Sequence, residues 1–186
     1  SLFGNATIRF ALPLYLLNHT GSSALYGMVT ACAFIPAILL SPIGGIIADR
    51  INKRNIMVIL DFLTAAVIIV FSVLMGKVDL VFLITVTMMV LFSIAGVYQP
   101  SVQASVPALV SAEYFMTANS IINTISSFAS LLGPVLGGIV YSAYGLGPVL
   151  YVCIICFILS AVMELFIKIP FVKWESGIGI WHIIKQ

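Results

Sequence analysis

Residues 45–54 have the sequence Gly45-Ile46-Ile47-Ala48-Asp49-Arg50-Ile51-Asn52-Lys53-Arg54 and lie between two long apolar segments. Four of these ten residues carry a charge, whereas charged residues make up only 8% of the whole chain. A short basic connection between two apolar segments is typical of a loop that joins two membrane-spanning helices. The stretch therefore predicts a membrane protein and marks the ends of two of its helices.

The composition excludes an ordinary soluble domain. Hydrophobic residues make up 62% of the 186 residues and the mean hydropathy is +1.21, whereas a soluble domain has about 45–50% apolar and about 25% charged residues. A spanning helix needs about 20 mostly apolar residues, and six runs approach or exceed this length. They are Leu2 to Leu17, Leu25 to Ala48, Ile56 to Met75, Leu80 to Val110, Phe115 to Tyr144 and Pro148 to Ile169. We expect an all-α integral membrane protein with a six-helix bundle in residues 1–169, whose first helix is truncated at its start.

Positive charge gathers on alternate connections. Arg50, Lys53 and Arg54 follow the second run, and Lys168, Lys173 and Lys185 lie at or after the sixth. Because cytoplasmic loops are enriched in Lys and Arg, we expect loop 49–55 and the C-terminal end in the cytoplasm. Proline disfavours a helical residue before it, so residues 170–186, which begin at Pro170, are expected to start a cytoplasmic linker. The net charge of only +2 gives no indication of a nucleic-acid partner.

An internal repeat relates the second run to the fifth. Residues 39–47 read LLSPIGGII, and residues 131–140 read LLGPVLGGIV, with one residue inserted. Since the two copies are three helices apart along the chain, and three is odd, the second copy crosses the membrane in the opposite direction. This pattern predicts two inverted three-helix repeats, which together with Gly/Pro-interrupted helices are typical of secondary transporters. Proline bends a helix, and paired glycines let a second helix approach closely.

The basic loop resembles the loop signature of the major facilitator superfamily, G-x-x-x-D-R-x-G-R/K-R/K. Gly45, Asp49, Arg50, Lys53 and Arg54 match it, and Asn52 stands in place of the second glycine. The resemblance implies the first half of a twelve-helix fold, with the second six-helix half absent from this chain. It also implies that the five matching residues form a conformational latch, in which Asp49 meets the opposite half. The alternative is that Asp49 pairs locally with the cations of its own loop, because a helix C-terminus disfavours an anion by about 0.3–1 kcal/mol.

The fifth run carries a second match. Gly133, Pro134, Gly137 and Gly138 are similar to the G-P-x-x-G-G motif of antiporter members of the family, and residues 107–120 resemble its drug-exporter branch, which includes macrolide efflux and enterobactin exporters. The resemblance implies a secondary active exporter of amphipathic drug-like or siderophore-like molecules in the bacterial cytoplasmic membrane. It would work by alternating access and proton antiport, with the small-molecule substrate, the proton, the lipid bilayer and the second half as its partners.

Two ionisable residues lie inside apolar runs, where a charge at the bilayer centre costs about 2.5–3.5 kcal/mol and indicates a functional role. Arg9 lies in the middle of the first run. It meets an anionic group of the cargo or an acid of the second half, or else it only bonds to Asn5 one turn earlier. Asp61 lies near the start of the third run. It extends the network of Asp49 and Arg54, pairs simply with a loop cation, or carries a proton.

Other residues indicate no chemistry. Cys153 and Cys156 form a C-x-x-C pair inside an apolar run, where a free cysteine usually behaves as a small buried hydrophobe. Glu164 and Lys168 have the i, i+4 spacing of a helical ion pair and are given no transport role. The sequence predicts no enzyme, no cofactor and no metal site. The alternative function is a stand-alone six-helix permease subunit or scaffold without transport activity of its own.

Overall fold

The structure, a computed structural model, describes residues 1–167, except for the side chains of residues 46–50, 108 and 112. It contains six long helices and one 3-10 turn, and no strand within this range. These are α1 (Leu2–Thr20), α2 (Ser23–Arg50), α3 (Lys53–Leu74), α4 (Leu80–Leu109), η1 (Ala112–Tyr114), α5 (Phe115–Tyr144) and α6 (Leu146–Leu165). All but α1 are long and apolar enough to cross a membrane. The predicted all-α class is confirmed, and the chain is a multi-pass membrane protein.

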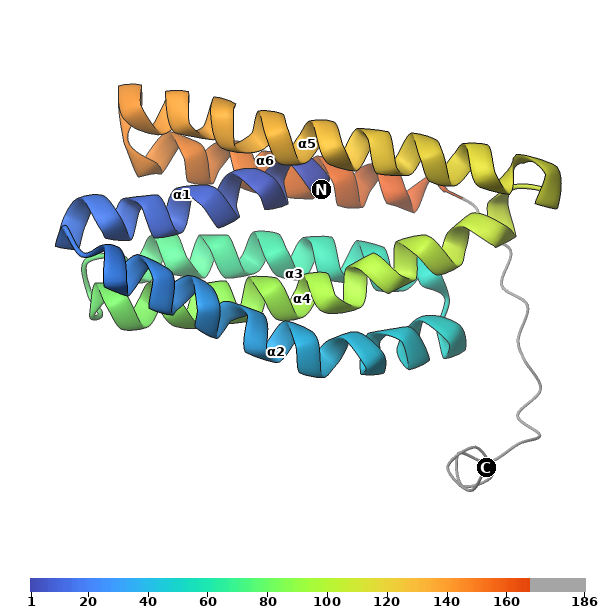
Figure 1. The fold of residues 1–186 in the computed structure, drawn as a ribbon, viewed down its shortest axis with the longest axis horizontal. Coiled ribbons are helices and arrows are strands. Elements are labelled where there is room, and N and C mark those ends of the chain that lie inside the picture. The colour runs from blue at the N-terminus through green and yellow to red at the C-terminus, as the bar shows by residue number, and fades with distance from the viewer. Residues whose placement is uncertain (168–186) are drawn as a thin grey trace, which may run out of the picture.

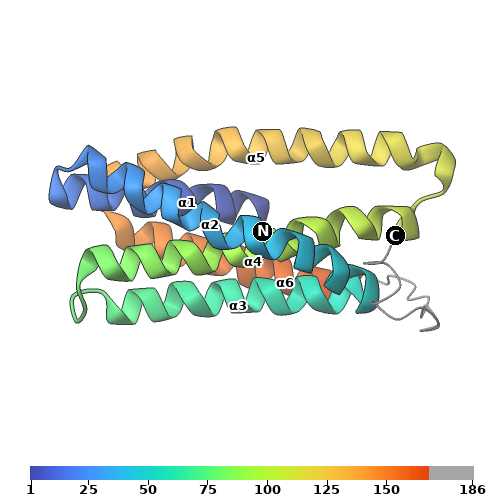
Figure 2. The ribbon, with the colours of Figure 1, turned by 60° about the horizontal axis from the view of Figure 1, so that its bottom comes forward.

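The connections alternate between the two ends of the bundle (Figure 1), and Figure 2 shows the same arrangement from another side. The α1–α2, α3–α4 and α5–α6 turns lie at one end, and the α2–α3 and α4–α5 connections lie at the other. Each turn at the first end contains a glycine with positive φ, at Gly21, Gly76 and Gly145. A residue with a Cβ atom rarely adopts this backbone conformation, so these glycines allow the chain to reverse within very few residues.

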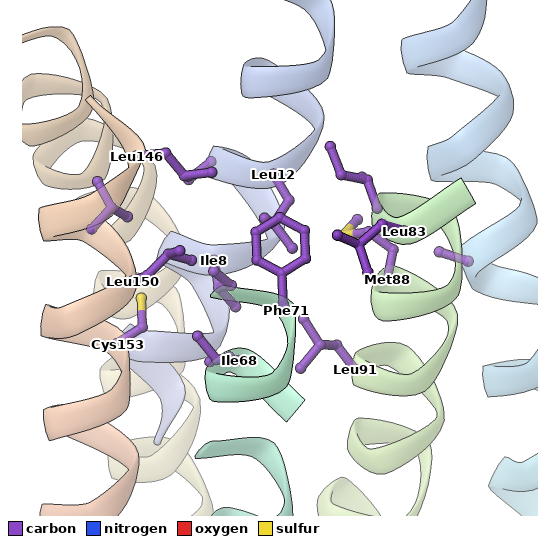
Figure 3. Close-up of a cluster of buried hydrophobic side chains, with 14 of the residues drawn as sticks. Ile8, Leu12, Ile68, Phe71, Leu83, Met88, Leu91, Leu146, Leu150 and Cys153 are labelled. Atoms are coloured by element: carbon purple, nitrogen blue, oxygen red, sulfur yellow. The ribbon is translucent and has the colours of Figure 1, made fainter. Parts of the chain in front are cut away.

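The apolar core lies between α1, α3, α4 and α6 (Figure 3). Phe71 of α3 is central to it, and Ile8 and Leu12 of α1, Met88 of α4 and other long aliphatic side chains surround it. By contrast, only 11% of the apolar span of α2 and 11% of that of α5 is buried. α2 packs on α4, and α5 packs on α1. The outer faces of α2 and α5 are therefore free to contact lipid or other protein.

The predicted runs agree with the helices to within three residues, except at the C-terminal end of the sixth. α6 begins at Leu146 rather than Pro148, directly after Gly145 ends α5, and it is helical only to Leu165. The amides of Phe166 and Ile167 bond to Met163 and Glu164, a tightening that ends many helices. The predicted end at Ile169 and the predicted linker 170–186 lie outside the described residues.

Candidate functional site

A cavity of about 620 Å³ lies between α1, α4 and α5. Its volume is within the range of about 300–1,000 Å³ that is usual for small-molecule sites. The lining includes one guanidinium group, asparagine and glutamine amides, and serine hydroxyl groups. The lining residues are Leu2, Asn5, Ala6, Arg9, Gln99, Asn123, Ser126, Ser127, Ser130 and Pro134. This cavity therefore has a polar wall made by three helices and a single charged group.

Arg9 is held against α4. Its Nη2 donates to the Leu91 carbonyl oxygen at 3.4 Å, and its guanidinium carbon lies 4.1 Å from the centre of the Phe92 ring. A cation over an aromatic ring gains about 0.5–2 kcal/mol, depending on its desolvation. Within the described part of the chain, the buried Nε has no hydrogen-bond partner. α4 therefore positions the guanidinium group but leaves part of its donor capacity unused.

Asn5 also lines the cavity, one helical turn before Arg9. Its Nδ2 donates to the Ser1 carbonyl oxygen at 3.4 Å. Among the described residues Arg9 and Asn5 form no hydrogen bond with each other. The partners of Arg9 come from α4 instead. Gln99 of α4 and Asn123 of α5 both lie in the cavity wall.

The glycines of α5 bring it close to α1. A Cβ atom at Gly133 would lie 2.6 Å from the Cβ of Ala6, and one at Gly137 would lie 2.8 Å from Cγ2 of Thr7. The Thr7 hydroxyl donates to the Gly133 carbonyl oxygen at 3.2 Å. Pro134, which interrupts the helical hydrogen bonding, lines the cavity between these glycines. The motif therefore forms the contact of α5 with α1 at the edge of the cavity.

Gly138, the last residue of the same motif, has more room. A Cβ atom there would lie 3.4 Å from the Phe10 ring, which is an ordinary contact. Gly133 and Gly137 are thus the two positions of the motif at which helix approach requires glycine.

The loop signature is only partly described. The side chains of Asp49 and Arg50 lie outside the described residues, and so does the predicted latch. Gly45 faces open space, since a Cβ atom there would have no neighbour within 4 Å. Lys53 is half-buried. Arg54 donates through Nη2 to the Leu165 carbonyl oxygen at the end of α6, where a cation favourably offsets the helix dipole.

A second polar cluster lies between α3, α4 and α6. Asp61 is only 1% exposed and Glu164 only 8%. The Tyr98 hydroxyl donates to Glu164 Oε1 at 2.6 Å and accepts from the Ser1 hydroxyl at 2.9 Å. Ser160 of α6 lies beside the Asp61 carboxyl group. Within residues 1–167, Asp61 Oδ2 and Glu164 Oε2 have no hydrogen-bond partner.

Sequence reasoning missed the role of Glu164 in this cluster. It paired Glu164 with Lys168, which lies outside the described residues. The structure places Glu164 on the buried face of α6, where Cys153, Phe157 and Ala161 are also buried. Cys153, Phe157, Ala161 and Glu164 are three or four positions apart, and this helical spacing was the signal available in the sequence. A carboxyl group that continues an apolar stripe is expected to face the bundle interior.

Comparison with known proteins gives a consistent family. Residues 1–177 match the family model described as Major Facilitator Superfamily. Macrolide efflux protein A of Streptococcus pyogenes is 22% identical over 171 residues, which cover 91% of this chain and 42% of that protein. Multidrug resistance protein MdtG of Enterobacter lignolyticus is 31% identical over 158 residues, which cover 80% of this chain and 37% of that protein. Multidrug resistance protein MdtG of Salmonella arizonae is 32% identical over 158 residues, which cover 80% of this chain and 38% of that protein.

The chain thus spans about two fifths of the length of these relatives, between 37% and 42%. The family model, however, covers it from the first residue almost to the last. Together with the six-helix architecture, this match places the protein: the chain belongs to the Major Facilitator Superfamily.

Proposed function

We propose that this chain is the N-terminal six-helix half of a secondary active transporter that exports amphipathic small molecules by alternating access. The observation that carries the proposal is the polar cavity between α1, α4 and α5, which has a volume suited to a small molecule. In this proposal α1 also crosses the membrane. The names of the relatives, which refer to macrolide efflux and multidrug resistance, support drug-like cargo, with siderophore-like compounds as the neighbouring class.

Helix packing supports two inverted three-helix repeats. α2 packs on α4 as α5 packs on α1, and α3 packs on α6. Exchanging the first three helices with the last three leaves this pattern unchanged. A Cβ atom at Gly44 of α2 would lie 2.8 Å from the Val97 Cα of α4, and the equivalent glycine of α5, Gly137, makes the equivalent approach to α1.

The exposed faces of α2 and α5 support a second six-helix half that covers them and completes the cavity. Large apolar side chains of both helices are exposed, among them Met28, Phe34, Ile38 and Leu39 of α2 and Met116, Ile121, Phe128, Leu131 and Val135 of α5. The linker proposed for residues 170–186 would lead into that half. Arg9 would then contact either an anionic group of the cargo or an acid of the second half.

We assign the protein to the bacterial cytoplasmic membrane, with loop 49–55 inside the cell. Lys53 and Arg54 follow directly on the α2–α3 turn, and cytoplasmic loops favour such residues. Proton antiport is the proposed energy source, because export against a gradient needs a second solute that moves downhill.

The test of this function is the accumulation of drugs and metal chelates in cells with and without the whole protein. We expect cells that contain the protein to accumulate less of at least one compound, and a protonophore to abolish the difference. Equal accumulation of every compound in both cell types would contradict the proposal. A difference that persists with the protonophore would contradict proton antiport alone.

The latch has its own test. We expect Asp49→Asn to reach the membrane in normal amounts but to lose transport, because the neutral amide cannot attract cations across the interface of the two halves. Membrane abundance and efflux are measured side by side, with Asp79→Glu at the α3–α4 turn as a control that keeps its charge. Normal transport by Asp49→Asn would overturn the latch.

A further inference from the structure

We propose that Glu164, Asp61 and Tyr98 form the proton-binding site of this transporter, apart from the cargo cavity. The inference rests on the proposed function, since such a site has a role only if a proton gradient drives transport. It concerns a cluster that the loop signature and the fifth-helix motif do not include.

Two buried carboxyl groups face the same interior region. Asp61 and Glu164 are almost completely buried, and each has one oxygen without a partner among the residues described. An ionised carboxylate that is buried without a cation costs several kcal/mol and normally avoids this cost by taking up a proton. Asp61 lies beside Ser160, which precedes Glu164 by one turn of α6, so the two carboxyl groups are neighbours in the bundle interior. Two carboxylates that share one buried site do not readily ionise together, so in this proposal the pair holds an exchangeable proton.

Among residues 1–167, the surrounding charged, titratable and hydroxyl groups come from four helices. α3 contributes Asp61 and, further toward the helix start, Arg54, whose guanidinium group is bonded to the Leu165 carbonyl oxygen. α4 contributes Tyr98 and α6 contributes Glu164. From α1, the Ser1 hydroxyl donates to Tyr98.

Tyr98 allows Glu164 to exist both with and without its proton. The Tyr98 hydroxyl donates to Oε1 and stabilises the carboxylate, while Oε2 remains available to take up the proton. The Ser1 hydroxyl donates to Tyr98 in turn, which directs the phenolic hydrogen toward Glu164. Tyr98 is therefore a positioning residue, and Glu164 is the group that binds the proton.

The cluster is connected to the cavity through α4. Tyr98 points into the cluster, and the next residue, Gln99, lines the cavity. The same helix holds Arg9 through Leu91 and Phe92. Pro100 removes the helical hydrogen bond to the Gly96 carbonyl, so this part of α4 bends more easily than an intact helix. A change in the Tyr98–Glu164 bond is thereby passed to the wall that contacts the cargo.

The experiment compares two transport modes of the whole protein in liposomes, with radiolabelled erythromycin as the probe. Uphill uptake driven by a pH gradient requires proton binding and release, whereas exchange of labelled for unlabelled probe at equal pH requires only alternating access. We expect Glu164→Gln and Asp61→Asn to lose uphill uptake to the level of protein-free liposomes and to keep exchange. The matched control is Glu113→Gln, which removes an exposed acid of η1, and it should keep both modes.

The outcomes separate the two proposals. Uphill uptake by Glu164→Gln at the native level would overturn the proton site and leave the exporter intact. A native protein that neither exchanges nor accumulates the probe contradicts export of that probe. If Glu164→Gln and Asp61→Asn both lose exchange as well, the pH profile of Tyr98→Phe tests the proton site. We expect Tyr98→Phe to keep exchange and to shift the pH profile of uphill uptake upward, because the carboxylate loses a hydrogen bond. An unchanged profile would reject the site.

Discussion

The cavity and the acid cluster place polar groups in a membrane in opposite ways. Cavity residues such as Gln99 and Asn123 are exposed, and the one cation, Arg9, is half-buried. In the cluster the two acids are at most 8% exposed and are surrounded by α3, α4 and α6. An open polar wall suits a solvated molecule that enters and leaves the cavity. A buried pair of acids suits a proton, which can reach them without an open channel. Within residues 1–167 the two regions share α4, which contributes Tyr98 to the cluster and Gln99 to the cavity.

Separating α1 from α5 should damage the cavity most. We expect Gly133→Leu to abolish export and to lower the stability of the purified protein, because even a Cβ atom would lie 2.6 Å from Ala6 and overpacking typically costs about 1–3 kcal/mol. Efflux and the thermal unfolding midpoint in detergent are the measurements. Gly27→Ala is the control, since a Cβ atom there meets nothing within 4 Å. A stable, active Gly133→Leu protein would mean that the α1–α5 contact does not shape the cavity.

The cluster should respond in the opposite sense, with lost function and intact stability. We expect Asp61→Asn to unfold at or above the native temperature, since removing a buried, uncompensated charge relieves a desolvation cost of several kcal/mol. The purified variant is compared with the native protein by thermal unfolding at neutral pH. A clear drop in the unfolding midpoint would show that the cluster is mainly structural.

The effect of substituting Arg9 should depend on the charge of the cargo, so it is the most selective of these tests. We expect Arg9→Gln to weaken the binding of compounds that carry a carboxylate by about tenfold or more, since hydrogen bonds to charged groups contribute about 1.5–3 kcal/mol. Neutral analogues of the same compounds should bind nearly as before. Equal weakening for both classes would indicate that Arg9 pairs with an acid of the second half instead.

The helices themselves were readable from the sequence, because a spanning helix is set by local composition. The use of glycine in α5 was readable as well, although the residues it meets, Ala6 and Thr7, were not. One of the alternatives for Arg9 was a bond to Asn5 one turn away, but its hydrogen bond in the described residues goes to Leu91, 82 residues further along the chain. The bond of Glu164 to Tyr98, 66 residues earlier, was not predicted, while the predicted pair of Glu164 with Lys168 lies outside the described residues. Contacts between distant helices depend on packing that local spacing does not encode.

The bond from Arg54 to the Leu165 carbonyl oxygen has a consequence for how the protein is made. α3 leaves the ribosome long before α6, so early in synthesis Arg54 lacks the Leu165 carbonyl oxygen that accepts its hydrogen bond in the finished bundle. Only the insertion of the sixth helix supplies that acceptor, at the end of α6. The contact thus joins an early helix to a late one, and the described bundle is complete only when α6 has been inserted beside α3.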